Sequence, residues 1–223
     1  MKNIERFIDE LADVSAPRVF NPWRDVDAVN DFGREAPSIR RDNLRRYLAG
    51  RLGHARLLLI AEAAGYQGAK FSGIAMTSER QLLASGSLGD ELFAGEKRRT
   101  SRESVRAQGF TEPTATIVWG RMLEAGLAGR EWVNWNTFAW HPQRDGPLTN
   151  RTPTPREFEA GVPALNRFLS LYPGVPVVAV GEKARGKLDE LGVRVVAAVR
   201  HPANGGATEF RKGIDRVLLD LRG

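Results

Sequence analysis

The chain has 223 residues, of which 42% are hydrophobic and 27% are charged, as is typical of globular proteins. It has no cysteine and three histidines, which excludes disulfide frameworks, cysteine-ligated zinc, iron–sulfur clusters and thiol catalysis. The net charge of +6 suits a polyanionic partner, although only six of the 33 basic residues are lysines and codon bias explains such an arginine excess equally well.

The sequence predicts one domain that spans residues 1–223. No apolar run approaches the roughly 18 residues of a membrane-spanning helix. The N-terminal stretch mixes acidic and basic residues at helical spacing, unlike a secretory signal. We therefore expect a cytoplasmic protein.

Residues 1–50 are predicted to form a helical segment that packs on the rest of the domain. Apolar residues from Ile4 to Leu11 share one helical face, and Pro22 in the FNPWR stretch is expected to end that helix. A second helix is predicted over 38–51, with its arginines, Arg40 among them, on a solvated face.

Strand and helix patterns alternate along the rest of the chain. Four short apolar runs predict buried parallel strands at 56–61, 132–136, 176–180 and 193–199. Helical patterns lie between them at 114–125 (with Thr111 or Thr114 as N-cap), 154–170 and 182–191. This alternation predicts an α/β fold with a central four-stranded parallel sheet between helical layers, whose ligand site lies beyond the carboxyl ends of the strands.

The first two strand exits carry residues that are unusual for their positions. Glu62 ends the first apolar run and is followed by two glycines and then by Phe71. Asn134 and Asn136 fall on the same side of the second strand, where asparagine is a poor strand former. An ordinary loop with a buried phenylalanine, and asparagines bound to loop backbone, explain these features as well.

The last two exits add a basic turn and a histidine. Gly181-Glu182-Lys183 begins a helix whose free N–H groups suit a phosphate, as in any such turn. His201 ends the fourth apolar run and is followed by Pro202 and a glycine-rich loop. A purely structural histidine remains the alternative interpretation.

Taken in order, LLLIAEAAG with FSG, NWNTF, VVAVGEKA and RHPANGG resemble the motifs of the uracil-DNA glycosylase superfamily over about residues 56–211. The first motif, from Ala61 to Gly65, is nearest to the family form GEAPG. It has Ala63 where the best-known branch has its water-activating aspartate, and Gly65 where the GQDPY form has the tyrosine that excludes thymine. Without cysteines the chain lacks the iron–sulfur cluster of the GEAPG branch, so it resembles a divergent, cluster-free branch.

The resemblance implies a monofunctional glycosylase that acts in base excision repair. It would hydrolyse the N-glycosidic bond of deoxyuridine in DNA, release free uracil and leave an abasic site, with the base flipped out of the helix and with no metal or cofactor. Two catalytic residues are implied. His201 would donate a hydrogen bond to the O2 atom of the base, and Glu62 would position water, stabilise the sugar cation or act as a base.

The implied substrate-binding and DNA-binding residues surround these two. Phe71 would stack on the base, Asn136 would read its edge, and Tyr66 would fill the position of the thymine methyl group. Ala61, Ala63 and Gly65 complete the implied base-binding set. The implied DNA contacts are Ser72, Lys183, Arg200, Pro202, Ala203, Asn204, Gly205 and Arg211.

We expect a monomer that processes single-stranded DNA at least as well as duplex DNA, because the loop after His201 has only small residues to wedge into a helix. Two alternatives remain open at the level of the sequence. One is a non-catalytic module that binds uracil or abasic sites in DNA. The other is a glycosylase for another deaminated base, such as hypoxanthine.

Overall fold

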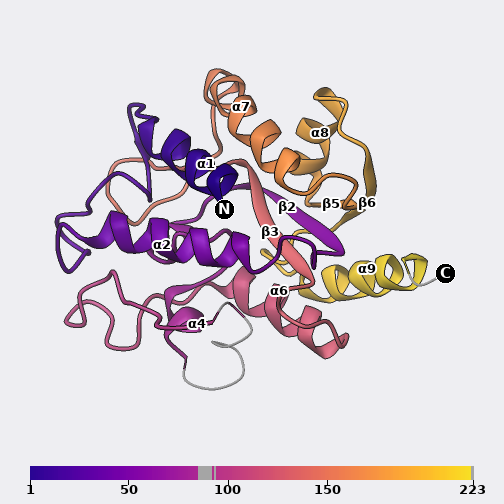
Figure 1. Cartoon of the computed structure of the whole chain (residues 1–223), viewed down its shortest axis with the longest axis horizontal. Coiled ribbons are helices and arrows are strands. Elements are labelled where there is room, and N and C mark those ends of the chain that lie inside the picture. The colour runs from indigo at the N-terminus through magenta and orange to yellow at the C-terminus, as the bar shows by residue number, and fades with distance from the viewer. Residues whose placement is uncertain (85–91, 93, 222–223) are drawn as a thin grey trace.

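The computed structural model describes residues 1–84, 92 and 94–221 (Figure 1). Its elements follow one another as α1 (Lys2–Asp13), β1 (Val19–Phe20), α2 (Ala36–Ala49), β2 (Leu57–Ala63), α3 (Ala69–Ser72), α4 (Glu79–Leu83), α6 (Pro113–Glu124), β3 (Trp132–Phe138), β4 (His141–Pro142), α7 (Pro155–Leu171), β5 (Val177–Val180), α8 (Glu182–Glu190), β6 (Val195–Val199) and α9 (Ala207–Asp220). No helix in these described ranges is both long enough and apolar enough to cross a membrane.

The main sheet has four parallel strands in the order β3-β2-β5-β6. Helices α7 and α8 cover one face, and α6 and α9 cover the other (Figure 1). This arrangement confirms the predicted three-layer α/β/α fold. The chain goes from β2 to β3 on one side and later returns to β5 on the other side of β2. The order therefore reverses between β2 and β5, where ligands bind in open sheets of this kind.

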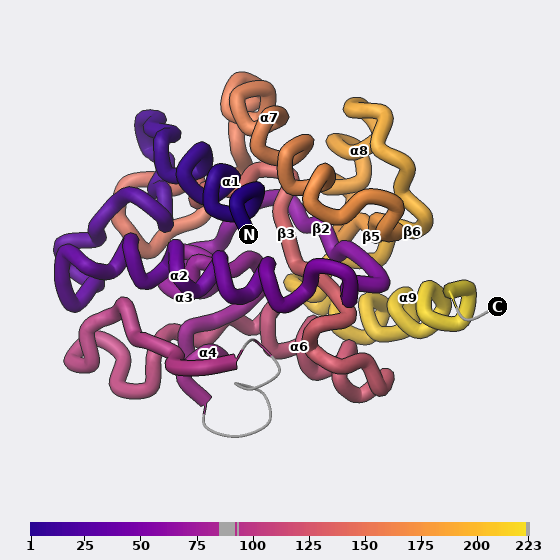
Figure 2. The backbone as a smooth tube through the Cα atoms, viewed as in Figure 1, coloured from indigo at the N-terminus to yellow at the C-terminus, as the bar shows by residue number. Residues whose placement is uncertain are grey.

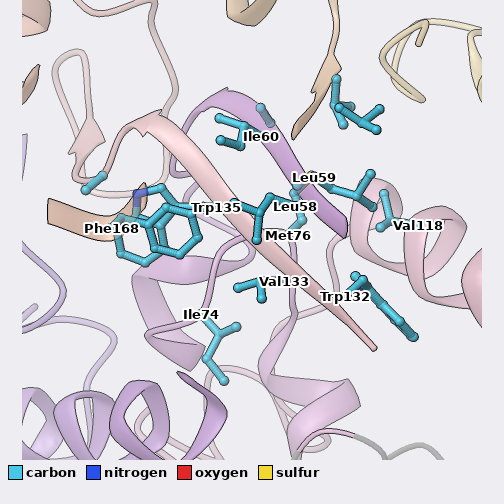
Figure 3. Packing of buried hydrophobic residues seen from close by; sticks show 14 of the residues in the cluster. Leu58, Leu59, Ile60, Ile74, Met76, Val118, Trp132, Val133, Trp135 and Phe168 are labelled. Carbon is cyan, nitrogen blue, oxygen red and sulfur yellow. The ribbon is translucent and has the colours of Figure 1, made fainter. Parts of the chain in front are cut away.

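The core forms around β3, which is buried along its whole length. Trp135 of β3 stacks on Phe168 of α7 with their ring centroids 4.6 Å apart (Figure 3). Phe7 of α1 packs against the same tryptophan at 5.5 Å, so the N-terminal helix belongs to the same apolar cluster as the sheet. Burial of such large aromatic surfaces is the main stabilising contribution to a fold of this size.

The prediction of a fully buried fourth strand is wrong for β6. Its first four residues alternate between partly buried and exposed, with Val196 47% exposed, and only Val199 is buried. The physical reason is position, because β6 is an edge strand and its covering helices leave part of one face open. Its apolar composition alone did not distinguish an edge strand from a central one.

Two expectations for the N-terminal segment are also wrong. Helix α1 ends at Asp13, before the FNPWR stretch, and the chain then pairs β1 with β4. Arg40 does not face solvent, because its guanidinium forms a fully buried ion pair with Asp31. Helix α2 runs beside the short α3 (Figure 2), where buried Lys70 pairs with Asp27 at 2.8 Å. The Lys70–Asp27 pair ties this N-terminal segment to the segment that follows β2.

Candidate active site

A cavity of about 820 Å³ lies at the carboxyl ends of β2, β5 and β6, at the reversal of strand order. Residues from all three strand exits line it, together with the start of α6 and the loop before α7. The exits of β2 and β6 bring Glu62 and His201 to the same cavity, although they are far apart in the sequence. The site thus lies where the alternating pattern predicted it.

Glu62 lies at the end of β2 between Ala61 and Ala63, and all three residues line the cavity. Its Oε1 atom lies 3.4 Å from Nζ of Lys183, which donates a hydrogen bond of 2.5 Å to Oγ1 of Thr152. The backbone carbonyl of Glu62 accepts a hydrogen bond of 2.7 Å from Thr137. The carboxylate therefore lies beside the positive charge of Lys183.

His201 follows β6 and has a defined tautomer. The backbone N–H of Ala203 donates to Nδ1 at 3.1 Å, so a neutral imidazole here carries its proton on Nε2. Burial and the neighbouring Arg200 lower the pKa of His201. Gly181 (φ 92°) passes so close that a Cβ atom there would lie 3.1 Å from the Cβ of His201. The result is a neutral histidine with one fixed N–H donor.

The loop after His201 projects three small residues into solvent. Pro202 is buried, whereas Ala203, Asn204 and Gly205 are exposed, with Asn204 and Gly205 in left-handed conformations. Ala203 and Asn204 also line the cavity, as do Pro202, Arg200 and Lys183. Arg211 is exposed on α9, outside the lining. The roles of these residues in DNA binding stay predictions.

The backbone of the β2 exit is held at Ala64 by two buried side chains. Asn136 pairs with Ala61 across the sheet, and its amide oxygen accepts from the Ala64 N–H at 3.3 Å in the orientation that satisfies both of its polar atoms. Nδ1 of His141 lies 3.0 Å from the Ala64 carbonyl, and burial lowers the pKa of His141 to about 4. His141 is therefore neutral and donates this bond. No sequence pattern indicated this contact, because the two residues are 77 positions apart.

Three of the expected base-binding side chains, those of Phe71, Tyr66 and Asn136, do not lie on the cavity surface. Phe71 is fully buried and stacks on Phe110 at 3.9 Å with a 6° angle between the rings, so one ring face is already covered. Tyr66 is partly buried, and its backbone N–H donates to Oδ1 of Asn150 at 3.1 Å. None of the three belongs to the described lining, whereas Gly65 does. Their contacts with a base stay predictions.

The expectation that Ser72 contacts DNA conflicts with its position. Ser72 is fully buried, and its hydroxyl donates to the carbonyls around it, including that of Thr77 at 2.7 Å, and accepts from the N–H of Ile74 at 3.0 Å. Its hydrogen-bonding capacity is used within the turn after α3. A side chain in this environment stabilises the loop and is closed to a phosphate.

Sequence reasoning missed Glu112, which also lines the cavity. Glu112, rather than Thr111 or Thr114, occupies the N-cap position of α6, but its side chain makes no capping hydrogen bond. Its carboxyl group lies over the glycines that follow β2, and a Cβ atom on Gly68 would lie 1.9 Å from Oε2. Burial raises the pKa of Glu112 to about 7. The small residues after β2 were visible in the sequence, but not what covers them.

Comparisons with known proteins agree with this geometry. The family model described as "Uracil DNA glycosylase superfamily" matches residues 49–222. The crystal structure of wild-type SMUG2 from Pedobacter heparinus is similar in fold, with a TM-score of 0.68, 12% sequence identity, and coverage of 99% of this chain and 98% of that one. None of the curated proteins that were searched matches the chain. The family match covers most of the chain and includes all four strands of the main sheet, so the chain belongs to the uracil DNA glycosylase superfamily.

Proposed function

We propose that this protein is a uracil-DNA glycosylase that hydrolyses the N-glycosidic bond of deoxyuridine in DNA, releasing uracil and leaving an abasic site. The observation that carries the proposal is His201, a neutral imidazole with a fixed Nε2–H donor, in the same cavity as the carboxylate of Glu62. Cleavage of this bond needs a donor for the departing base and a negative charge near the sugar, and these two residues meet both needs.

His201 stabilises the departing base. As the glycosidic bond breaks, its electron pair passes to the base, and negative charge develops on O2. A preorganised hydrogen-bond donor at such an atom contributes about 3–4 kcal/mol to catalysis in comparable oxyanion sites. The bond from the Ala203 N–H to Nδ1 keeps the Nε2 proton in place for this purpose.

Glu62 acts on the other side of the broken bond. Its ionised carboxylate stabilises the cationic sugar and holds the water molecule that adds to C1′. Water supplies a hydroxyl group to the sugar and its remaining proton ends on the base or in solvent, which completes the hydrolysis. Lys183 orients this carboxylate through the 3.4 Å contact.

The base must leave the helix to reach this cavity. In this proposal the exposed loop of Ala203, Asn204 and Gly205 occupies the space that the base vacates, and its small residues suit single-stranded DNA at least as well as duplex DNA. Asn136 carries an amide that matches the N3–H and O4 of uracil, and to read a base it must exchange its hydrogen bonds to the Ala64 N–H and the Trp135 carbonyl.

The test is a base-release assay on a labelled oligonucleotide that contains one deoxyuridine, single-stranded or paired with guanine or adenine, followed by alkaline cleavage at abasic sites. We expect release from all three substrates and a loss of about a hundredfold or more in His201→Ala. His54→Ala is the matched control, because His54 is exposed on the far side of β2 from its exit.

A parallel oligonucleotide with hypoxanthine tests for another deaminated base. If the protein releases hypoxanthine but not uracil, deoxyinosine in DNA would replace deoxyuridine as the proposed substrate. Binding to the deoxyuridine strand with no release of any base would contradict the enzymatic proposal and favour a DNA-binding module.

A further inference from the structure

Glu112 is a cavity carboxyl group to which the proposed reaction gives no role. It occupies the N-cap position of α6 and lines the same cavity as Glu62 and His201. Its Oε2 atom is buried and has no hydrogen-bond partner among the described residues. A buried polar atom without a partner is costly, so its retention in a cavity points to a ligand that supplies the partner.

The glycines after β2 are shaped around this side chain. A Cβ atom on Gly68 would lie 1.9 Å from Oε2 of Glu112, and one on Gly65 would lie 3.4 Å from Oε1. Any larger residue at Gly68 would displace the carboxyl group. Since Gly65 also lines the cavity, the carboxyl group lies at the wall that a ligand would meet.

The charges around the two carboxyl groups differ. Glu62 has Lys183 beside it, whereas none of the described cations forms an ion pair with Glu112. Arg151 is held by Glu157 at 2.6 Å. The other titratable or charged groups that line the cavity are Glu62, Glu182, Lys183, Arg151, Arg200 and His201. Glu62 and Glu112, two of the three carboxyl groups that line the cavity, are therefore in different electrostatic environments.

The ligand chemistry follows from this environment. A carboxyl group without a cation repels the phosphates of DNA, so its partner is a neutral part of the substrate. In its protonated form it donates one hydrogen bond, and the carbonyl oxygens and ring nitrogens of a base are the acceptors that an extruded nucleotide offers. Burial raises the pKa of Glu112 to about 7, so this form is well populated at neutral pH.

We propose that Glu112 is a base-contacting specificity residue whose protonated carboxyl group donates a hydrogen bond to an acceptor on the edge of the extruded base. This inference rests on the proposed glycosylase function. It assigns to base recognition the part of the cavity where Glu112 lies against Gly65 and Gly68. The role is distinct from those of His201 and Glu62, which act on the bond that breaks.

The test compares the pH dependence of base release for the wild type, Glu112→Gln and Glu112→Ala. In the wild type, kcat/KM for base release from DNA should fall about tenfold between pH 6.5 and pH 8.5 as Glu112 loses its proton. Glu112→Gln keeps a donor that does not titrate, so it should stay within about threefold of the wild type at pH 6.5 and lose the alkaline fall. Glu112→Ala should be lower by about tenfold or more at pH 6.5.

Glu124→Gln is the matched control, since it makes the same chemical change on the same helix at an exposed position outside the cavity. Its pH profile should superimpose on that of the wild type. Superimposed profiles for Glu112→Gln and the wild type would overturn the proposal, as would equal losses in Glu112→Gln and Glu112→Ala. Thermal unfolding of each variant identifies any loss that comes from misfolding.

A binding measurement separates this inference from the proposed function. Affinity is measured by fluorescence anisotropy at pH 6.5 for single-stranded DNA with one deoxyuridine and for the same strand with a tetrahydrofuran abasic analogue. Glu112→Ala should weaken only the deoxyuridine strand, by about fivefold or more. Equal effects on both strands would overturn the base contact. If Glu112→Ala weakens only the deoxyuridine strand but the wild type releases no base, only the glycosylase function would be overturned.

Discussion

Glu62 shows how one residue's role depends on its neighbours. The family's best-known branch activates water with an aspartate at a position where this chain has Ala63, and the acidic group at this strand exit is Glu62 instead. The carboxylate lies 3.4 Å from the ammonium group of Lys183, so it is held as one half of an ion pair. Positioning of water and stabilisation of the sugar cation suit such a carboxylate better than general-base catalysis.

A double-mutant cycle tests this role. Glu62→Gln should lower the single-turnover rate of base release about tenfold, because an amide still holds water but carries no charge. Lys183→Ala should lower the rate less than Glu62→Gln does, and it should have no further effect in the Glu62→Gln background if Lys183 acts through Glu62. A loss beyond about a thousandfold in Glu62→Gln would instead indicate essential charge or base catalysis.

Phe110 and His141 lie outside the motifs, and their roles also follow from the residues that they contact. Phe110 covers one face of Phe71, so the aromatic residue of the first motif is already stacked before any base arrives. His141 is neutral because burial lowers its pKa to about 4, and it fixes the carbonyl of Ala64 next to the cavity. Both residues support the β2 exit from segments that no motif marks.

At the scale of elements, the short helix α3 connects the β2 exit to the N-terminal segment. It ends at Gly73, which has a φ of 77° and whose carbonyl accepts a hydrogen bond of 3.2 Å from Trp23. A Cβ atom there would lie 2.6 Å from the backbone oxygen of Arg40 in α2. The close approach of two backbones, as well as the left-handed conformation, therefore requires glycine.

Alanine substitutions separate these two requirements. Gly174→Ala, at a φ of 75° with nothing within 4 Å, should cost only the conformational strain of about 1–2 kcal/mol in the free energy of unfolding. Gly73→Ala should cost about 2 kcal/mol more, because α2 must also move. Urea denaturation of both variants measures the difference. Equal losses would mean that the contact with α2 relaxes freely.

At the scale of the whole molecule, the net charge of +6 is effective for DNA binding only where basic groups face the substrate. Many arginines are committed to internal contacts, as the buried pair of Arg40 with Asp31 shows. Arg200 differs, since it is exposed and lies at the cavity beside His201 and the projecting loop. We expect it to contact a phosphate next to the flipped nucleotide.

The salt dependence of DNA binding measures that contact. Arg200→Ala should reduce the slope of log K against log salt by about 0.7 for single-stranded DNA, which corresponds to one phosphate contact. Arg6→Ala removes the same charge from α1, where Arg6 pairs with Glu10, and should leave the slope unchanged. Equal reductions in both variants would indicate that only the net charge matters.

The sequence by itself determined the layers of this fold and predicted two residues that line one cavity. Continuous apolar runs and helical periodicity are local properties, so they predicted the four strands, the helices between them and the strand exits that carry Glu62 and His201. The motif order at those exits also indicated the family that the comparison then showed.

Only the tertiary structure decided the order of the strands, the exposure of β6 and the partners of the site residues. These properties depend on contacts between segments that are distant in the chain, as between Glu112 and Gly68 or His141 and Ala64. No local pattern encodes such contacts, because whether a residue is buried or paired depends on the distant residue that it meets as well as on its own type. Burial is a tertiary property of the same kind. It raises the pKa of Glu112 and encloses the side chain of Ser72 in the protein interior.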